Sequence, residues 1–352
     1  MELHNKTIHQ LSDMLKNKEV TSVELTQSFI DKSSADEYIT ATFDAALETA
    51  RLVDAKTAKG EEIPVLAGIP YALSDSICTN GVATTCGSKI LENFIPPYDA
   101  FVVHKLKQQS APMLGKLKMK EFGSGVVKYG EGVNLKPTYG LVSRAGLVAF
   151  ASSMDRIEIS AANIYDCAVV LGAIAGVDKA DTITVDTSVP DYFKALQNDA
   201  GVNVGVLGKD FELKYGKYAP AAHYIISSAE ASSNLACYDG IRFGRRAESY
   251  DDLYDLYKKS RSEGFGDEVQ KQILFGTYVL SAGQYEKYYK KALQVRTLIR
   301  SELDEVLSKY DVITADDAAA ADLAGLPVLT AGDKMLVGKA FDEATLLRAA
   351  NY

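Results

Sequence analysis

The stretch "VLAGIPYALSDSICTNG", residues 65–81, begins as an apolar run and ends in a polar loop. A short apolar run of this length, bounded by a glycine-containing turn, is typical of a buried strand, which we expect to end near Leu73. The loop that follows places Ser74 and Ser76 around Asp75 and contains no basic residue. An acidic residue at the end of a buried strand, without a cation beside it, is the feature that most needs an explanation.

A helix and a second strand are predicted after this loop. We expect Asp99 to be the N-cap of the helix, whose inner face is formed by Val102, Val103 and Leu106. The run "APMLGKL" at 111–117 then predicts another strand. Strand, helix and strand in this order form the βαβ unit of a mostly parallel sheet, so the sequence predicts an α/β fold.

Further elements are predicted before this unit. "TSVE" at 21–24 is a capping box, in which Thr21 accepts from the third helical N–H and Glu24 reaches back to the cap. "YITATF" at 38–43 is rich in β-branched and aromatic residues and predicts a strand. A helix from about Asp44 to Lys59 follows, with one apolar stripe: Ala46, Ala50 and Val53.

The second half of the chain is richer in helix. Helices are predicted at about 218–238, 250–263, 266–282 and 284–309. The last has an amphipathic stripe at three- and four-residue spacing: Tyr285, Tyr288, Ala292, Val295, Ile299, Leu303 and Val306. "DVITA" at 311–315 predicts a late strand.

Composition excludes several classes of protein. The 352 residues are 47% hydrophobic and carry a net charge of −9, which disfavours a surface that binds nucleic acid through phosphate contacts alone. We interpret Arg242, Arg245 and Arg246 as part of a solvated face. The N-terminus has no apolar signal region and no segment is a membrane-span candidate, so a cytoplasmic location is expected. Four dispersed cysteines and four histidines predict no disulfide framework and no zinc site.

Five long stretches of the chain match a known pattern: "LAGIPYALSDSICTNGVATTCGSKILENFIPPYDAFVVHKLKQQSAPMLGKLKMKEF" (66–122), "LKPTYGLVSRAGLVAFASSMDRI" (135–157), "SSAEASSNLACYDGIRFG" (227–244), "SRSEGFGDEV" (260–269) and "LSAGQYEKYYKKALQVRTLI" (280–299). They resemble the amidase signature family and, within it, the A subunits of bacterial glutamyl-tRNA(Gln) amidotransferases. The resemblance implies a twisted mixed sheet covered by helices on both faces, shortened relative to the family. It implies one domain over 1–352, with a helical part (1–65), a sheet-forming part (66–176) and a helix-rich second half (177–352).

The family's chemistry uses a lysine base, a bridging serine and a nucleophilic serine to hydrolyse an amide. The resemblance places the lysine four residues after the proline of "GIP", where this chain has Ser74. The family's long Gly/Ser-rich segment, which carries both serines and the oxyanion N–H groups, is also missing. Here "KMKEFGSG" (118–125) passes through a few residues into "LKPTYG" (135–140). We therefore assign no catalytic residue, and no cofactor is implied.

Substrate-binding positions have also changed. "DGIRFG" has Phe243 where tyrosine is usual, and "EVQKQI" has Lys271 and Gln272 where an arginine pair is typical. Arginine forms bidentate contacts with carboxylates, so its loss weakens a substrate clamp. Arg242, Arg261 and Arg296 survive in family-like settings, and the substrate-binding candidates are Arg242, Phe243, Gln272 and Arg296.

Two functions remain open. We favour a degenerate relative of the family's A subunits, without glutaminase activity, that acts as a scaffold or regulator. Its partners are then the B and C subunits of an amidotransferase, or a second copy of itself, with no direct contact to nucleic acid or membrane. The alternative is an active amidohydrolase that uses Ser124 or Cys86 as a substitute nucleophile. We interpret Ser124, between glycines, as part of a short connector, and Cys86 as a packed small residue. Ser88 and Lys89 form no catalytic pair, because neighbours on a strand face opposite ways.

Overall fold

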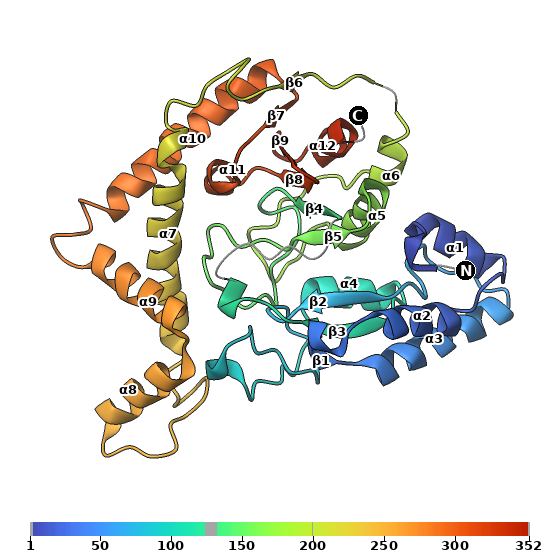
Figure 1. Ribbon diagram of the computed structural model, residues 1–352, viewed down its shortest axis with the longest axis horizontal. Helices are drawn as coiled ribbons and strands as arrows, with labels where there is room; N and C mark the ends of the chain where they lie inside the picture. Colours follow the sequence, from blue (N-terminus) through green and yellow to red (C-terminus); the bar gives the residue numbers. More distant parts are fainter. Residues whose placement is uncertain (1–2, 124–131, 199, 351–352) are drawn as a thin grey trace.

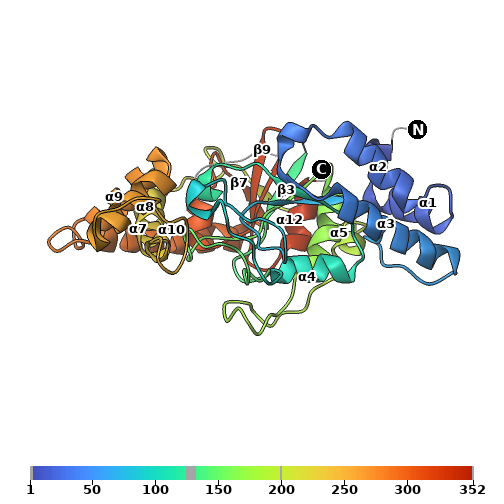
Figure 2. The same cartoon turned by 90° about the horizontal axis from the view of Figure 1, so that it is seen from below.

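The computed structural model describes residues 3–123, 132–198 and 200–350 of the chain. Two sheets occupy the centre, the N-terminal helices pack at one side, and a group of long helices extends as an arm on the other (Figures 1 and 2). The predicted mixed α/β class is confirmed. Among the residues described, no helix is both long enough and apolar enough to cross a membrane.

The N-terminal part consists of α1 (Ile8–Lys16), α2 (Ser22–Lys32), β1 (Tyr38–Ala41) and α3 (Phe43–Ala58). The predicted capping box is confirmed: Thr21 Oγ1 accepts from the Glu24 N–H at 3.1 Å, and Glu24 Oε2 accepts from the Thr21 N–H at 2.9 Å. The predicted apolar stripe of α3 is buried along its length (Ala46, Ala50 and Val53). The periodicity of apolar residues was sufficient to predict this buried face, because these three side chains point toward the body of the protein.

The first sheet contains the predicted βαβ unit. β2 (Tyr71–Ser74) and β3 (Met113–Leu117) are parallel and joined by α4 (Phe101–Gln108), while β1 pairs with β3 in the antiparallel sense. The strand predicted from Val65 begins only at Tyr71, because residues 65–68 form a turn and Gly68 has a φ of +74°.

The predicted N-cap of α4 is wrong. Ala100 occupies the cap position and no side chain caps the helix. Asp99 instead accepts from the Asn80 N–H at 2.9 Å and forms an ion pair with Lys107 at 2.7 Å. Its carboxylate therefore ties the polar loop to the helix.

The second sheet has six strands in the order β5-β4-β8-β9-β7-β6. Only the β6–β7 pair is parallel. An isolated bridge between Ile77 and Leu147 links the loop after β2 to the segment that connects β4 and β5. The strands are β4 (Val133–Lys136), β5 (Ile159–Ala161), β6 (Val204–Gly205), β7 (Val312–Thr314), β8 (Val328–Ala331) and β9 (Lys334–Gly338).

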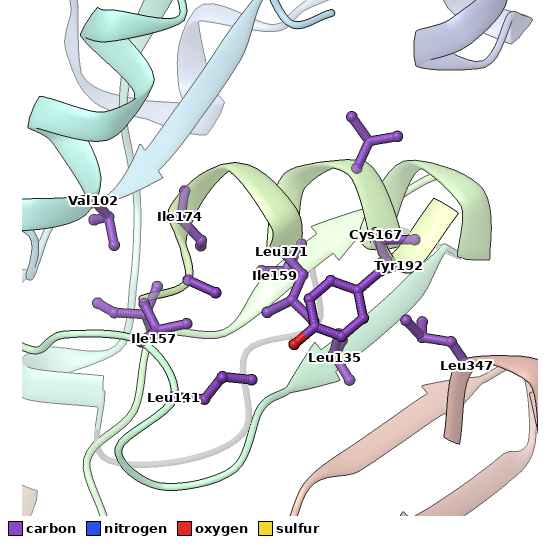
Figure 3. Packing of buried hydrophobic residues seen from close by; sticks show 14 of the residues in the cluster. Val102, Leu135, Leu141, Ile157, Ile159, Cys167, Leu171, Ile174, Tyr192 and Leu347 are labelled. Carbon is purple, nitrogen blue, oxygen red and sulfur yellow. The ribbon is translucent and has the colours of Figure 1, made fainter. Parts of the chain in front are cut away.

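Helices cover both faces of the six-stranded sheet, as expected. Neighbouring residues of one strand enter different clusters: Leu329 packs with α5 and α12, whereas Val328 packs with α7, α10 and α11. Figure 3 shows Leu135, Ile159 and Leu171 packed together in the first cluster. The helices on that face are α5 (Ile164–Ile174), α6 (Tyr192–Ala195) and α12 (Glu343–Ala350).

The arm is built from α7 (Ala219–Asn234), α8 (Leu253–Gly264), α9 (Asp267–Leu280) and α10 (Tyr289–Lys309), with α11 (Ala319–Ala324) beside them. α7 and α9 approach closely at Gly276, where a Cβ atom would lie 1.9 Å from the Ser228 carbonyl oxygen. The predicted start of the last long helix is wrong: Tyr285 and Tyr288 lie in the turns before α10 and are 40% and 37% exposed. Their rings pack at tilted angles against those of Tyr289 and Tyr278 instead.

We expect Leu171→Ala to lower the free energy of unfolding by about 2–5 kcal/mol, because it leaves a cavity in a close-packed core. Leu171 is 0% exposed on α5. Leu52 on α3 is 58% exposed, so Leu52→Ala should change stability by less than about 0.5 kcal/mol. Urea denaturation of both variants measures the difference. Equal effects would show that the face between α5 and β4 is not a packed core.

Candidate functional site

The site suggested by the sequence is the loop that follows β2. Ser74, the last residue of β2, lies opposite Leu117 on β3 and is half-buried. Its hydroxyl contacts Ser76 Oγ at 3.1 Å and Met119 Sδ at 3.3 Å. Among the described residues, no ammonium or imidazole group bonds to this hydroxyl. Ser74 is therefore satisfied by neutral partners.

Asp75 holds the loop together. Its carboxylate is fully buried and Oδ2 accepts from the Thr85 N–H at 2.9 Å and the Thr85 hydroxyl at 2.5 Å. A weaker contact of 3.3 Å comes from the Gly87 N–H. Burial raises the pKa of Asp75, and the hydrogen bonds from Thr85 and Gly87 act in the opposite direction. The retained aspartate thus fixes the 85–87 turn against the end of β2.

The cation of this region is Lys116, which sequence reasoning missed. Lys116 is the last residue but one of β3 and is 0% exposed. Its ammonium donates to the Ile77 carbonyl oxygen and to Thr84 Oγ1, the latter at 3.2 Å. Burial lowers the pKa of Lys116 to about 8, while Asp75 acts to raise it. A lysine in the middle of the apolar run "MLGKL" was the available signal, since lysine is almost never fully buried unless it is paired.

Lys116 does not take the place of the missing base. Its two hydrogen-bond acceptors are both on the loop, and no hydrogen bond joins its Nζ to Ser74 or Ser76 within the part of the chain that is described. A general base must reach the proton that it removes, directly or through one water. The geometry gives Lys116 a structural role, in which it satisfies two loop oxygens.

Cys86 does not have the surroundings of a reactive thiol. It is 0% exposed and packs in a cluster with Ile90 and Phe122. Burial raises the pKa of the Cys86 thiol well above its usual range, whereas a nucleophilic cysteine needs a lowered pKa. Its backbone N–H donates to the Asp75 carbonyl oxygen at 3.2 Å, so the residue belongs to the same turn.

Two further nucleophile candidates were Ser124 and the pair of Ser88 with Lys89. Ser124 lies outside the described residues. Ser88 and Lys89 were expected on a strand, but Ser88 is the N-cap of a 3₁₀ helix over Lys89–Leu91. The Ser88 hydroxyl donates to Glu121, which also accepts from the Gly266 N–H. Through Glu121 this serine connects the loop to the start of α9, and among the residues described no lysine or histidine contacts its hydroxyl.

The substrate-binding candidates do not form one cluster. Arg242 and Phe243 stand together on an exposed loop, with the guanidinium 5.8 Å from the ring centre. Gln272 is on α9, and its Oε1 atom is buried without a partner among the described residues. Among the described residues, no hydrogen bond, ion pair or ring contact joins Gln272 to Arg242 or Phe243.

Arg296 on α10 is a structural clamp. It donates to the Leu323 carbonyl oxygen at 2.6 Å and to the Ser153 hydroxyl at 2.7 Å. A further bond of 3.1 Å reaches the Ser153 carbonyl oxygen. These contacts occupy all three guanidinium nitrogens, so Arg296 holds α10 to the 151–154 turn and to the end of α11.

No group of three or more His, Cys, Asp or Glu side chains is placed to hold a metal ion in the described part of the chain.

The pKa of Lys116 predicts a pH-dependent contribution to stability. Between about pH 8 and pH 10.5 Lys116 is deprotonated in the native state and still protonated in the unfolded state. The contribution of Lys116 to the free energy of unfolding therefore increases as pH rises through this window. Below pH 8 both states are protonated, and the native state bears the full cost of the buried charge. Wild type should therefore gain stability relative to Lys116→Met across this window, by about 3 kcal/mol at most.

Urea denaturation of both proteins at several pH values tests this expectation. The comparison cancels the titration of other groups, such as the buried cysteines. Lys89→Met is the control, because Lys89 is exposed and its removal should leave the pH profile of the wild type unchanged. A difference between wild type and Lys116→Met that stays constant with pH would contradict the assignment.

Comparisons with known proteins concern the family and the fold of this chain. The model of the Amidase family matches residues 24–133, 129–216 and 205–323. The A subunit of the glutamyl-tRNA(Gln) amidotransferase of Heliobacterium modesticaldum is 38% identical over 469 aligned positions, which cover 99% of this chain and 96% of that protein. Its counterpart from Moorella thermoacetica is also 38% identical, with the same coverage. The aligned region is longer than the 352 residues of this chain, so internal segments of the relatives are missing here.

Solved structures share the fold. One, described as part of a vestigial protein complex that reveals the origins of an s-triazine catabolic enzyme, has a TM-score of 0.80 at 19% identity and covers 98% of this chain and 97% of its own. The peptide amidase of Stenotrophomonas maltophilia has a TM-score of 0.79 at 23% identity, with coverages of 98% and 96%. The A subunit of the Thermotoga maritima amidotransferase has a TM-score of 0.63 at 24% identity, with coverages of 98% and 93%.

The structural likenesses concern the fold alone, whereas the family match and the 38% identity extend over most of the chain. The resemblance found in the sequence is confirmed, and this chain belongs to the amidase family.

Proposed function

We propose that this protein is an amidase-family member without amidase activity, which acts by binding other proteins. The observation that carries the proposal is the chemistry of the loop after β2. Ser74 bonds to a hydroxyl and a thioether, and the buried ammonium of Lys116 is held by Ile77 and Thr84. Hydrolysis of an amide by a serine requires a base in contact with the nucleophile.

A second observation supports the loss of activity. The resemblance places the bridging serine, the nucleophile and the oxyanion N–H groups in a long segment between the "MKEF" and "LKPTYG" motifs. Only a short connection joins Gly123 to Gly132 in this chain, and the alignment with the relatives contains more positions than the chain has residues. Removing the donors of an oxyanion hole costs orders of magnitude in rate even when a nucleophile remains.

A binding role is supported by the surface of the arm. Large apolar side chains stand exposed on α8 and α9: Leu253 is 59% exposed, Tyr254 77% and Leu274 71%. Tyrosine and other large apolar residues are typical of the centres of protein interfaces. Since the relatives at 38% identity are named as subunits of an amidotransferase, we propose its B and C subunits as partners. Self-association is the second possibility that the experiment distinguishes.

We expect no release of ammonia from glutamine, or from a simple amide, above a control without protein. Ser74→Lys should restore nothing, because a base without its nucleophile cannot transfer an acyl group. A coupled ammonia assay measures both. Turnover that Cys86→Ser or Ser124→Ala abolishes would instead establish the alternative of an active amidohydrolase.

We expect the protein to co-elute with the B and C subunits of the Heliobacterium modesticaldum amidotransferase in size-exclusion chromatography. Leu274→Asp should weaken this association at least about tenfold, because it places a charge in the apolar centre of the proposed interface. Leu52→Asp is the matched control, since Leu52 is an exposed leucine on the distant helix α3. A protein that elutes alone as a monomer contradicts the binding role, and a dimer without B and C favours self-association.

A further inference from the structure

A cleft of about 480 Å³ lies between α7 and the segment 139–153, and no residue of the loop after β2 lines it. The start of α10 and the end of α9 close its sides through Tyr289 and Leu280. None of the residues assigned above to the family's chemistry lines this cleft. Its volume lies within the range of small-molecule sites.

One face of α7 supplies hydrogen-bond acceptors to the cleft. Glu230, Ser233 and Asn234 all line it, and their spacing of three and four residues places them on the same side of the helix. They are half-buried or exposed rather than fully buried. α7 therefore presents a carboxylate, a hydroxyl and an amide oxygen to one space.

The contacts of these side chains leave one acceptor atom free on each. Glu230 Oε2 accepts from the Ser153 N–H at 2.9 Å, which leaves Oε1. Asn234 Nδ2 donates to the Phe150 carbonyl oxygen and to Ser152 Oγ, both at 2.9 Å, which leaves Oδ1. Within the described residues, Ser233 Oγ has no hydrogen-bond partner. The Ser152–Ser153 turn thus fixes the orientation of Glu230 and Asn234 before any ligand is present.

The charges around the cleft favour a cation. Arg144 is paired with Asp181 at 3.5 Å and donates to the Ser152 carbonyl oxygen. Asp155 is a half-buried carboxylate that accepts from the backbone N–H groups of Phe150 and Ala151. Glu230 has no ion-pair partner in the described part of the chain. A carboxylate that is desolvated on one side and unpaired gains most from a positively charged group.

The remaining walls are apolar. Ile183, Ala229 and Leu280 line the cleft together with the ring of Tyr289. They can bury a short hydrocarbon body, at about 0.8 kcal/mol for each buried methylene. A ligand that fits both parts carries a charged head and a small apolar tail.

We propose that this cleft binds a primary alkylammonium ion. The three N–H donors of a primary ammonium match the free acceptors on Glu230, Ser233 and Asn234. The alkyl chain lies against Leu280 and Ile183. A neutral alcohol offers one donor and no charge, and a quaternary ammonium offers no donor, so both bind more weakly.

Isothermal titration calorimetry with 3-methylbutylamine at about pH 7.5, where this amine is protonated, tests the proposal on the full chain. We expect a Kd on the order of 1 mM. Two ligands serve as controls: 3-methyl-1-butanol has the same tail without the charge, and choline has the charge without N–H donors. Each should bind at least about tenfold more weakly.

Glu230→Gln should weaken the binding of 3-methylbutylamine about tenfold or more, since it removes the charge and keeps an acceptor for Ser153. Glu286→Gln is the matched control and should change nothing, because Glu286 is an exposed carboxylate outside the cleft. Ser233→Ala removes an exposed hydroxyl and should weaken binding several-fold even if Glu230→Gln perturbs the fold. The proposal is overturned if no heat is detected up to about 10 mM amine, if the alcohol or choline binds as tightly, or if both cleft variants bind like wild type.

Discussion

The buried ammonium of Lys116 determines the shape of the loop on which the candidate site depends. A charged lysine inside a protein is stable only when oxygen atoms surround it, because removal from water is costly. Here the carbonyl oxygen of Ile77 and the hydroxyl of Thr84 fill that need, and Asp75 binds the neighbouring turn. The loop keeps one conformation for this reason, whether or not a catalytic group stands at its start.

A second set of contacts joins the arm to the sheets. The Ser152–Ser153 turn receives hydrogen bonds from Arg144, Asn234 and Arg296, and it donates one to Glu230. Ser152 and Ser153 thus join their own segment to both α7 and α10. Arg296, which the family resemblance made a candidate for substrate binding, here connects α10 to this turn and to the end of α11.

These contacts stabilise the fold without any catalytic group. The hydrogen bonds of Lys116, Asp75 and Arg296 contribute to folding and involve no substrate. The cluster between α5 and the six-stranded sheet likewise needs only apolar side chains of the right volume. Because none of this depends on a base at position 74, loss of the lysine leaves the architecture, the arm and its exposed apolar residues intact, which is the basis of the proposed binding role.

Sequence alone determined the features that depend on local periodicity and local hydrogen bonding. The capping box of Thr21 and Glu24, the buried stripe of α3 and the βαβ unit could all be read from neighbouring residues. That a lysine is expected where Ser74 stands came from the family resemblance. The start of β2 and the cap of α4 were misjudged, since a turn at 65–68 and the ion pair of Asp99 with Lys107 override local propensity. The role of Lys116 and the cleft beside Glu230 were decided only by tertiary structure. Each depends on atoms that are distant in sequence, so the partners that satisfy a buried charge or leave an acceptor free are known only once the chain is folded.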